Sequence, residues 1–323
     1  MAPIKPAYDP ELAVVLDAIP AGDITPESIP ALRKMQNDAA NLEITLSGDE
    51  PFTHHEKTST GPNGPVTISL FYPKNKATTP RPAIYHMHSG GMICGNRFTF
   101  FKDPLRWAKA AGAVAITVEY RLAPENPFPA GLNDCYAGLQ YVAEHAAELG
   151  LDADRLMVSG QSAGANLAAA VAIMARDRKG PKLCGMLLDC GMYDDRGKTA
   201  SINQYVKDGT WTRGSNETAW TAILGSQVGK ANVDPLAAVA RQTNLGGLPP
   251  AYLSVGSAEG FRDENVELAK KIWAAGGQAE VHVWPGGYHC FDMLAPDAAI
   301  SKACIQAKVG WAKKTLNEPL SKL

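Results

Sequence analysis

From about Pro65 onward, short apolar runs alternate along the chain with longer stretches of helical periodicity. The apolar runs are rich in Val, Ile and Tyr and predict strands over Val66–Tyr72, Ala83–His88, Val114–Glu119, Leu156–Ser159, Cys184–Leu188, Ala251–Val255 and Glu280–Trp284. The periodic stretches predict helices over Pro104–Ala111, Leu132–Leu149, Ala163–Arg178, Asp263–Ala275 and Ala298–Leu316. This alternation predicts an α/β fold with a mostly parallel central sheet and helices on both faces.

Two stretches depart from this alternation. Residues 1–50 contain apolar helical patches interrupted by several prolines. Residues 192–233 follow a predicted strand with a polar, aromatic segment that is far longer than a usual βα loop. Long segments of this kind are either lids or irregular outer decoration, and we interpret residues 192–233 as a lid.

Composition narrows the class of protein without defining its activity. Apolar residues make up 45% of the 323 residues, so a large core is expected. The 31 Lys+Arg and 33 Asp+Glu nearly balance, which argues against a nucleic-acid partner. The longest apolar run, Leu167–Ala175, is much shorter than the about 20 residues of a membrane span. The first residues lack the apolar stretch of a secretory signal, so a cytoplasmic location is expected, with the six cysteines as free, partly buried thiols.

The sequence Gly160–Gly164 reads G-x-S-x-G and places Ser162 between a predicted strand and a predicted helix. Flanking glycines permit a tight turn, and the helix N-terminus stabilises developing negative charge. These features predict a nucleophilic serine. The alternatives are an ordinary glycine-rich connection or a phosphate-binding loop, but the glycine patterns of phosphate loops are absent here.

A second glycine pair, Gly90 and Gly91, follows the strand predicted to end at His88. Acyl transfer needs backbone N–H donors for an oxyanion, and we assign those of Gly90, Gly91 and Ala163. His86 and His88 could suggest a metal site, but no further ligands accompany the pair, so no metal is expected. His88 is instead expected to anchor the glycine loop through hydrogen bonds.

The expected base and acid follow the last two predicted strands. His289 lies just after the strand Glu280–Trp284, where open α/β sheets build their sites. Glu259 lies in the loop after Ala251–Val255 and is assigned to orient the imidazole. Asp263 is the alternative acid, although its place at a helix start is typical of a capping residue. The chain order Ser162, Glu259, His289 is that of the α/β-hydrolases.

With these residues in hand, the sequence resembles the hormone-sensitive-lipase-like branch, bacterial family IV, of the α/β-hydrolases. The resemblance runs from about Pro65 to Trp311. It rests on motifs that match His88–Gly91, Tyr120–Ala130, Gly160–Gly164, Leu248–Pro250 and Glu259–Asp263. The chain departs from the family pattern at Ser89, which replaces a glycine, and at Gln161 and Glu259, which each replace an aspartate.

The resemblance implies a serine carboxylesterase that acts on short acyl chains without a cofactor. It also implies a helical cap built from residues 1–50 and 192–233 over a core of residues 51–323, and it suggests a homodimer. The expected partner is a small ester substrate. An amidase, formamidase or lactonase would share the same triad. A non-catalytic receptor on this fold is the rival from another class, and the presence of His289 argues against it.

Overall fold

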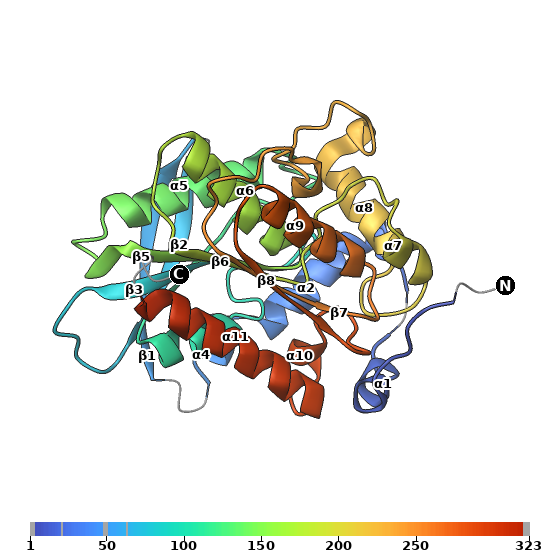
Figure 1. Cartoon of the computed structure of the whole chain (residues 1–323), viewed down its shortest axis with the longest axis horizontal. Helices are drawn as coiled ribbons and strands as arrows, with labels where there is room; N and C mark the ends of the chain where they lie inside the picture. Colours follow the sequence, from blue (N-terminus) through green and yellow to red (C-terminus); the bar gives the residue numbers. More distant parts are fainter. Residues whose placement is uncertain (1–3, 21, 48–50, 63, 319–323) are drawn as a thin grey trace.

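One eight-stranded sheet runs through the middle of the molecule in the computed structural model (Figure 1). The structure describes residues 4–20, 22–47, 51–62 and 64–318. The strand order is β1-β2-β4-β3-β5-β6-β7-β8. The pairs β1–β2 and β2–β4 are antiparallel and all other neighbours are parallel. The predicted α/β fold with a mostly parallel sheet is therefore confirmed.

Every predicted strand is present, and the sheet has one further strand at its edge. The strands are β1 (Phe52–Gly61), β2 (Gly64–Pro73), β3 (Arg81–Met87), β4 (Val114–Val118), β5 (Leu151–Gln161), β6 (Gly185–Asp189), β7 (Ala251–Gly256) and β8 (Ala279–Trp284). The unpredicted strand β1 is mostly polar and exposed. Polar and charged side chains on an edge strand hinder pairing with another molecule, and they also hide the alternating pattern that predicts a strand.

Helices cover both faces of the sheet, as expected. The long ones are α4 (Lys102–Ala111), α5 (Ala130–Glu144), α6 (Ala163–Asp177), α9 (Arg262–Ala274) and α11 (Ala299–Asn317). Helices α5, α6 and α9 pack on one face and share one apolar cluster, while α4 and α11 share a second cluster on the other face (Figure 1). Because the strands from β4 to β8 are parallel, their carboxyl ends lie at one edge of the sheet, where ligand sites of such sheets form.

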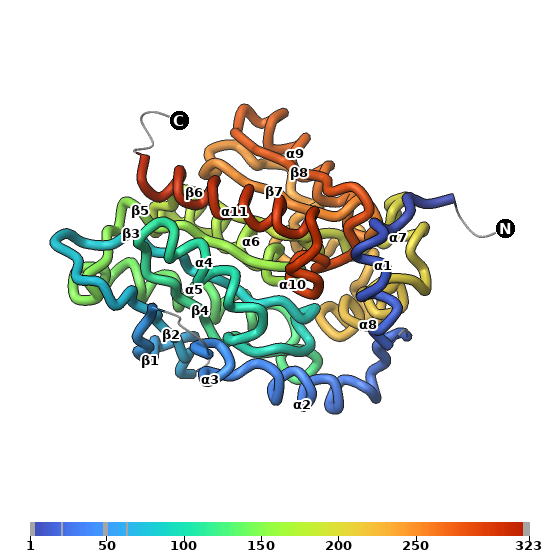
Figure 2. Tube along the Cα trace, turned by 90° about the horizontal axis from the view of Figure 1, so that it is seen from below, coloured from blue at the N-terminus to red at the C-terminus, as the bar shows by residue number. Residues whose placement is uncertain are grey.

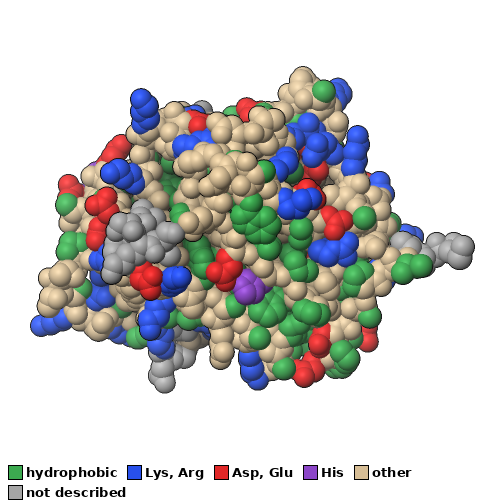
Figure 3. Space-filling view, viewed as in Figure 1, with side chains coloured by type: hydrophobic (Ala, Val, Ile, Leu, Met, Phe, Trp, Pro, Cys, Tyr) green, Lys and Arg blue, Asp and Glu red, His purple; other side chains and the backbone are tan. Residues whose placement is uncertain are grey.

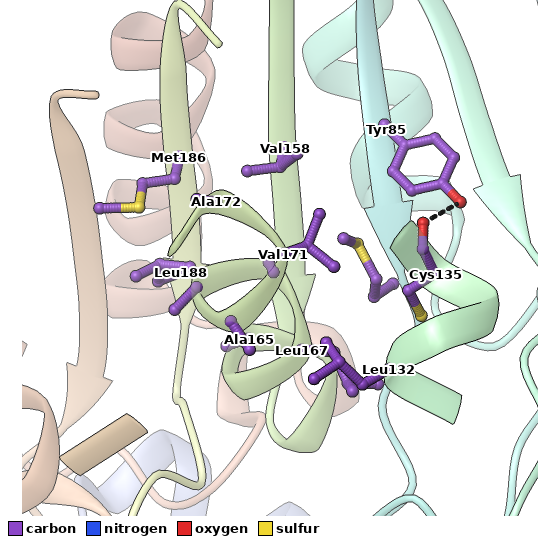
Figure 4. Packing of buried hydrophobic residues seen from close by; sticks show 14 of the residues in the cluster. Tyr85, Leu132, Cys135, Val158, Ala165, Leu167, Val171, Ala172, Met186 and Leu188 are labelled. Carbon is purple, nitrogen blue, oxygen red and sulfur yellow. Dashed lines mark hydrogen bonds between the residues drawn. The ribbon is translucent and has the colours of Figure 1, made fainter. Parts of the chain in front are cut away.

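Helix α6 is buried on all sides, and this fixes the turn before it. It packs against strands β5 and β6 beside α5, with Leu167 next to Leu132 of α5 (Figure 4). Tyr85 of β3 donates a hydrogen bond of 2.9 Å to the carbonyl oxygen of Cys135 in α5 (Figure 4). A helix that is apolar all round belongs in a core, and its N-terminus cannot shift independently of the sheet.

The two segments outside the alternating pattern lie together in space (Figure 2). The N-terminal segment forms α1 (Pro10–Leu16), η1 (Pro26–Ser28), α2 (Ile29–Ala39) and α3 (Leu42–Thr45). The inserted segment and the residues after it form α7 (Ala200–Gln204), α8 (Arg213–Leu224), η2 (Gly225–Gln227) and η3 (Val239–Arg241). Thr212 donates to Asp23 at 2.5 Å, and the amide of Ile24 donates to Ser215 at 2.9 Å. These hydrogen bonds join segments about 190 residues apart in sequence.

The remaining global features agree with composition. All six cysteines are free and buried, as predicted. Figure 3 shows basic and acidic side chains interspersed on the face it displays. Among the described helices, none has the length and apolarity to cross a bilayer. The short α10 (Phe291–Leu294) completes the helices and directly follows the loop of His289.

Candidate active site

Ser162 sits on a sharp turn between β5 and α6. Its φ of 55° lies in the left-handed region, which a non-glycine residue adopts only where the surroundings hold it. A Cβ on Gly160 would lie 2.0 Å from the carbonyl oxygen of Gly164, and a Cβ on Gly164 would lie 2.2 Å from that of Met87. The glycines predicted to permit a tight turn are therefore required by backbone contacts. The amide of Ser162 donates to Asp189 of β6 at 2.8 Å.

The three residues expected to act together lie in one line of hydrogen bonds. His289 Nε2 is 3.0 Å from Ser162 Oγ, and His289 Nδ1 is 2.7 Å from Glu259 Oε2. The other oxygen of Glu259 accepts the amide of Gly256 at 2.9 Å. All three side chains are buried. This is the arrangement of a nucleophile, a base and a group that orients the base.

The alternative acid, Asp263, lies elsewhere. Its carboxylate accepts hydrogen bonds from the amide of Ser201 at 2.7 Å and from the Arg262 side chain at 2.8 Å. It therefore ties α7 to the start of α9, and no hydrogen bond joins it to His289 in the described part of the chain. The structure thus places Glu259, and not Asp263, next to His289, whereas the sequence kept both acids as candidates.

Close packing of two neighbouring loops brings Glu259 and His289 together. Strands β7 and β8 are adjacent and parallel, so their carboxyl ends meet. A Cβ on Gly256 would lie 2.0 Å from the carbonyl oxygen of Gly287, and the amide of Ala258 donates to that same oxygen at 2.9 Å. The loops are thereby fixed against one another before any substrate binds.

The glycine loop after β3 leaves its amides free. Gly90 and Gly91 have φ values of 116° and 63°, which glycine adopts without strain. Within the described residues, no acceptor is paired with the N–H of Gly90, Gly91 or Ala163. The loop lies next to the turn of Ser162, because a Cβ on Gly164 would lie 2.2 Å from the Met87 carbonyl oxygen and 2.5 Å from that of His88. Unpaired N–H groups near a serine hydroxyl are what an oxyanion hole requires.

The two histidines before this loop have different partners. His88 Nδ1 is 2.7 Å from the carbonyl oxygen of Ser89, and the His88 ring stacks on Tyr120 at 4.0 Å. His86 Nδ1 contacts Ser159 Oγ at 3.0 Å. Burial, with a smaller contribution from His88, lowers the pKa of His86 to about 3, and burial also lowers the pKa of His88. Both rings are therefore neutral at pH 7.

Opposing effects act on the protonation of His289. Burial of the ring lowers its pKa, while the Cys190 sulfur, through charge and a hydrogen bond, and the Glu259 carboxylate raise it. The sum lies well above the ordinary value of histidine. The Glu259 carboxylate therefore stabilises the imidazolium that forms when the neutral ring takes a proton.

The inserted segment covers this cluster. Thr210 Oγ1 donates to the carbonyl oxygen of His289 at 2.6 Å, and the Trp211 ring lies 6.4 Å from the His289 ring. A Cβ on Gly91 would lie 2.5 Å from the Trp211 indole, so the indole lies directly against the glycine loop. Ser162 is only 2% exposed and His289 only 6% exposed.

Three residues at or near the cluster were not assigned from the sequence. Cys190 follows β6 and contacts Cys290 with a sulfur–sulfur distance of 3.6 Å. Trp211 was noticed as an aromatic residue but given no role. The place of Cys190 at the end of a parallel strand was an available signal, because such ends converge on one edge. Trp211 follows no regular element, and no pattern predicted its place.

The departures from the family motifs keep the geometry intact. Glu259 reaches His289 despite its extra methylene. Ser89 presents its carbonyl oxygen to His88. Gln161 is fully buried, and neither atom of its amide has a hydrogen-bond partner among the described residues.

The fold and this cluster together define a class, the serine hydrolases built on an α/β sheet. Residues 84–293 match the family model described as alpha/beta hydrolase fold. Because this match covers more than half of the chain, the chain belongs to the α/β hydrolase fold family.

Known proteins resemble the chain over most of its length. Esterase LipI of Mycobacterium tuberculosis is 31% identical over 281 residues, which cover 86% of each chain. Carboxylesterase NlhH of the same organism is 30% identical over 307 residues, or 91% of this chain and 93% of that relative. The solved structure of a bacterial heroin esterase superposes with a TM-score of 0.90 at 32% identity, covering 97% of this chain and 99% of the other. The chain is an enzyme of the carboxylesterase type, and the family recognised from its motifs is confirmed.

Proposed function

We propose that this enzyme hydrolyses carboxylic esters with short acyl chains through an acyl-enzyme on Ser162. His289 takes the proton from Ser162 Oγ as the oxygen attacks the ester carbonyl carbon, and Glu259 stabilises the imidazolium that forms. The N–H groups of Gly90, Gly91 and Ala163 hold the oxyanion, and His88 supports their loop. The proton then passes to the leaving alkoxide. A water molecule, activated by the same base, releases the acid.

One observation carries this proposal: the unbroken series from Ser162 Oγ through the His289 ring to Glu259 Oε2, at 3.0 and 2.7 Å. Burial of the series favours a small substrate, because little of Ser162 or His289 is reachable from solvent. Trp211 supports the same preference, since its indole lies against the loop proposed to hold the oxyanion.

Replacement of the proposed nucleophile tests the mechanism. We expect Ser162→Ala to fold normally and to hydrolyse p-nitrophenyl acetate at the background rate, because loss of a nucleophile costs up to about 10⁶ in kcat. A serine-directed organophosphate should add one covalent label, which peptide mass spectrometry should locate on Ser162. The matched control is Ser59→Ala, a buried serine of β1 whose hydroxyl has no partner among the described residues. Retention of a tenth of the activity by Ser162→Ala would rule out this nucleophile.

Residues 1–50 and 192–233 are proposed as the cap over the core of residues 51–323. The hydrogen bonds between Asp23 and Thr212, and between Ile24 and Ser215, support a joint role of the two segments.

The ratio of kcat/KM on matched esters, lactones and anilides tests the bond preference. Ester hydrolysis should exceed the other two, and a larger value on anilides or lactones would replace this proposal. The cytoplasmic location and the homodimer stay predictions.

A further inference from the structure

Two buried thiols stand beside the proposed base. Cys190 directly follows β6, and Cys290 directly follows His289. Their sulfur atoms are 3.6 Å apart, and neither side chain is more than 6% exposed. The proposed hydrolytic mechanism uses neither thiol.

The ligand atoms of Cys190, His289 and Cys290 all lie within 4.8 Å of one another. Two zinc–sulfur bonds of about 2.3 Å at a tetrahedral angle place their sulfur atoms about 3.8 Å apart. The observed 3.6 Å is close to that spacing. A disulfide would instead require the sulfurs to approach to about 2.05 Å. The pair is therefore spaced for a shared cation rather than for a bond to each other.

The backbone holds both cysteines in place. Cys190 and Cys290 have φ values of 40° and 62°, in the left-handed region that non-glycine residues rarely adopt. The amide of Cys190 donates to Ser254 of β7, and the carbonyl oxygen of Cys290 accepts the amides of Met293 and Leu294. Conformations of this kind persist where the surroundings over-determine them, and they recur at functional sites.

We propose that Cys190, Cys290 and His289 bind a thiophilic divalent cation of the Zn²⁺ or Cd²⁺ type, and that the bound ion inhibits the enzyme. Thiolate sulfur and imidazole nitrogen are the ligands such ions prefer. Binding releases both thiol protons to solvent, so two thiolates neutralise the dication in a buried place. Three protein ligands leave a fourth position open.

Inhibition follows from the ligand set and rests on the proposed function. His289 Nε2 contacts Ser162 and Nδ1 contacts Glu259. A cation on Nε2 takes the electron pair that would accept the Ser162 proton. A cation on Nδ1 displaces the proton that Nδ1 donates to Glu259, and that proton is released to solvent or moves to Nε2. Either the nucleophile loses its base or the base loses its orienting carboxylate.

Cadmium gives a readout that does not depend on catalysis. We expect Cd²⁺ titrated into the full chain to produce the ultraviolet charge-transfer absorption of thiolate–Cd²⁺ bonds at one ion per chain. Zn²⁺ should displace Cd²⁺ and abolish the absorption. Cys190→Ser and Cys290→Ser should each weaken Cd²⁺ binding by at least about tenfold. The matched control is Cys184→Ser, because Cys184 lies at the opposite end of β6 from Cys190 and should not alter the titration.

Activity is measured in the same samples. Ester hydrolysis should fall in parallel with the absorption and return after addition of a chelator, while the Cys190 and Cys290 variants should resist the ion. Cys190→Ala and Cys290→Ala, checked by circular dichroism, replace any serine variant that fails to fold. An absorption that is absent, or that survives loss of both thiols, overturns the site. Absorption at Cys190 and Cys290 in a chain without ester hydrolysis would overturn the proposed function and leave the site standing.

Discussion

At the scale of single residues, the proposed triad and its alternative differ only in the carboxylate that orients His289. Glu259 is the group that contacts His289, and Asp263 is engaged by Ser201 and Arg262. We expect Glu259→Gln to lower kcat on p-nitrophenyl acetate by about 10⁴, because an amide favours the wrong tautomer of the base and cannot stabilise its charge. Asp263→Asn is the control and should change kcat far less. A larger loss in Asp263→Asn would reverse the two roles.

Single residues also show how far sequence reasoning reached. Ser162 and His289 could be located because a glycine-flanked turn and a strand end each leave a local signal. The choice between Glu259 and Asp263 depended on where one loop places two side chains four residues apart, and that placement comes from the close contact of Gly256 with Gly287. Cys190 had the same signal of a strand end but was given no role. Trp211 had no such signal, since its position beside His289 results from tertiary packing alone.

At the scale of elements, a buried lysine joins three parts of the site's scaffold. Lys308 of α11 is 0% exposed, and its Nζ lies 2.7 Å from Asp189 at the end of β6 and 2.5 Å from Asp292 in α10. The backbone carbonyl oxygen of Asp189 also accepts the amide of Ser162. Lys308 therefore connects the end of β6, which is hydrogen-bonded to Ser162, with α10, the helix that follows His289.

Removal of this cation should be strongly destabilising. Lys308→Met leaves two buried carboxylates without their partner, and we expect the free energy of unfolding to fall by about 3–5 kcal/mol. Urea denaturation measures the change, with Lys302→Met on the exposed face of α11 as the control. The triple variant Lys308→Met/Asp189→Asn/Asp292→Asn should regain most of the loss. If Lys308→Met matches Lys302→Met, the ion cluster does not stabilise the fold.

Elements were predictable where hydrophobic periodicity and burial agree. Helix α11 was located within one residue at each end, but no periodicity could show that Lys308 faces inward, because a lysine normally counts as exposed. Strand β1 was missed for the opposite reason: its exposed Thr, His, Glu and Lys residues resemble a loop although they pair along the whole of β2. In both cases the hydrophobic pattern failed because tertiary contacts, and not residue type, decide where the polar side chains lie.

At the scale of the whole molecule, segments distant in sequence meet beside the proposed site. Trp211 should limit the size of the substrate because its indole lies against Gly91. We expect Trp211→Ala to raise the ratio of kcat/KM for p-nitrophenyl octanoate over acetate by about tenfold, within the range that methylene groups contribute to specificity. Trp273→Ala is the control, because Trp273 is an exposed residue of α9. An unchanged ratio would mean that Trp211 packs the cap without restricting the substrate.

The buried neutral histidines behind the glycine loop make the stability of the whole molecule depend on pH. The pKa of His86 is lowered from 6.5 to about 3 by burial, so between these values the unfolded chain binds a proton that the folded chain does not. Stability is therefore present above pH 6.5 and is lost as pH falls, by about 1.4 kcal/mol per pH unit for this one group. His86→Asn keeps a polar group near Ser159 but cannot titrate, so its free energy of unfolding should fall less steeply between pH 6 and about 4. Urea denaturation at several pH values measures the slope, with His55→Asn on the edge strand as the matched control. Equal slopes in wild type and His86→Asn would show that His86 is protonated inside the fold, and the loop beside Gly90 would then rest on a charged residue.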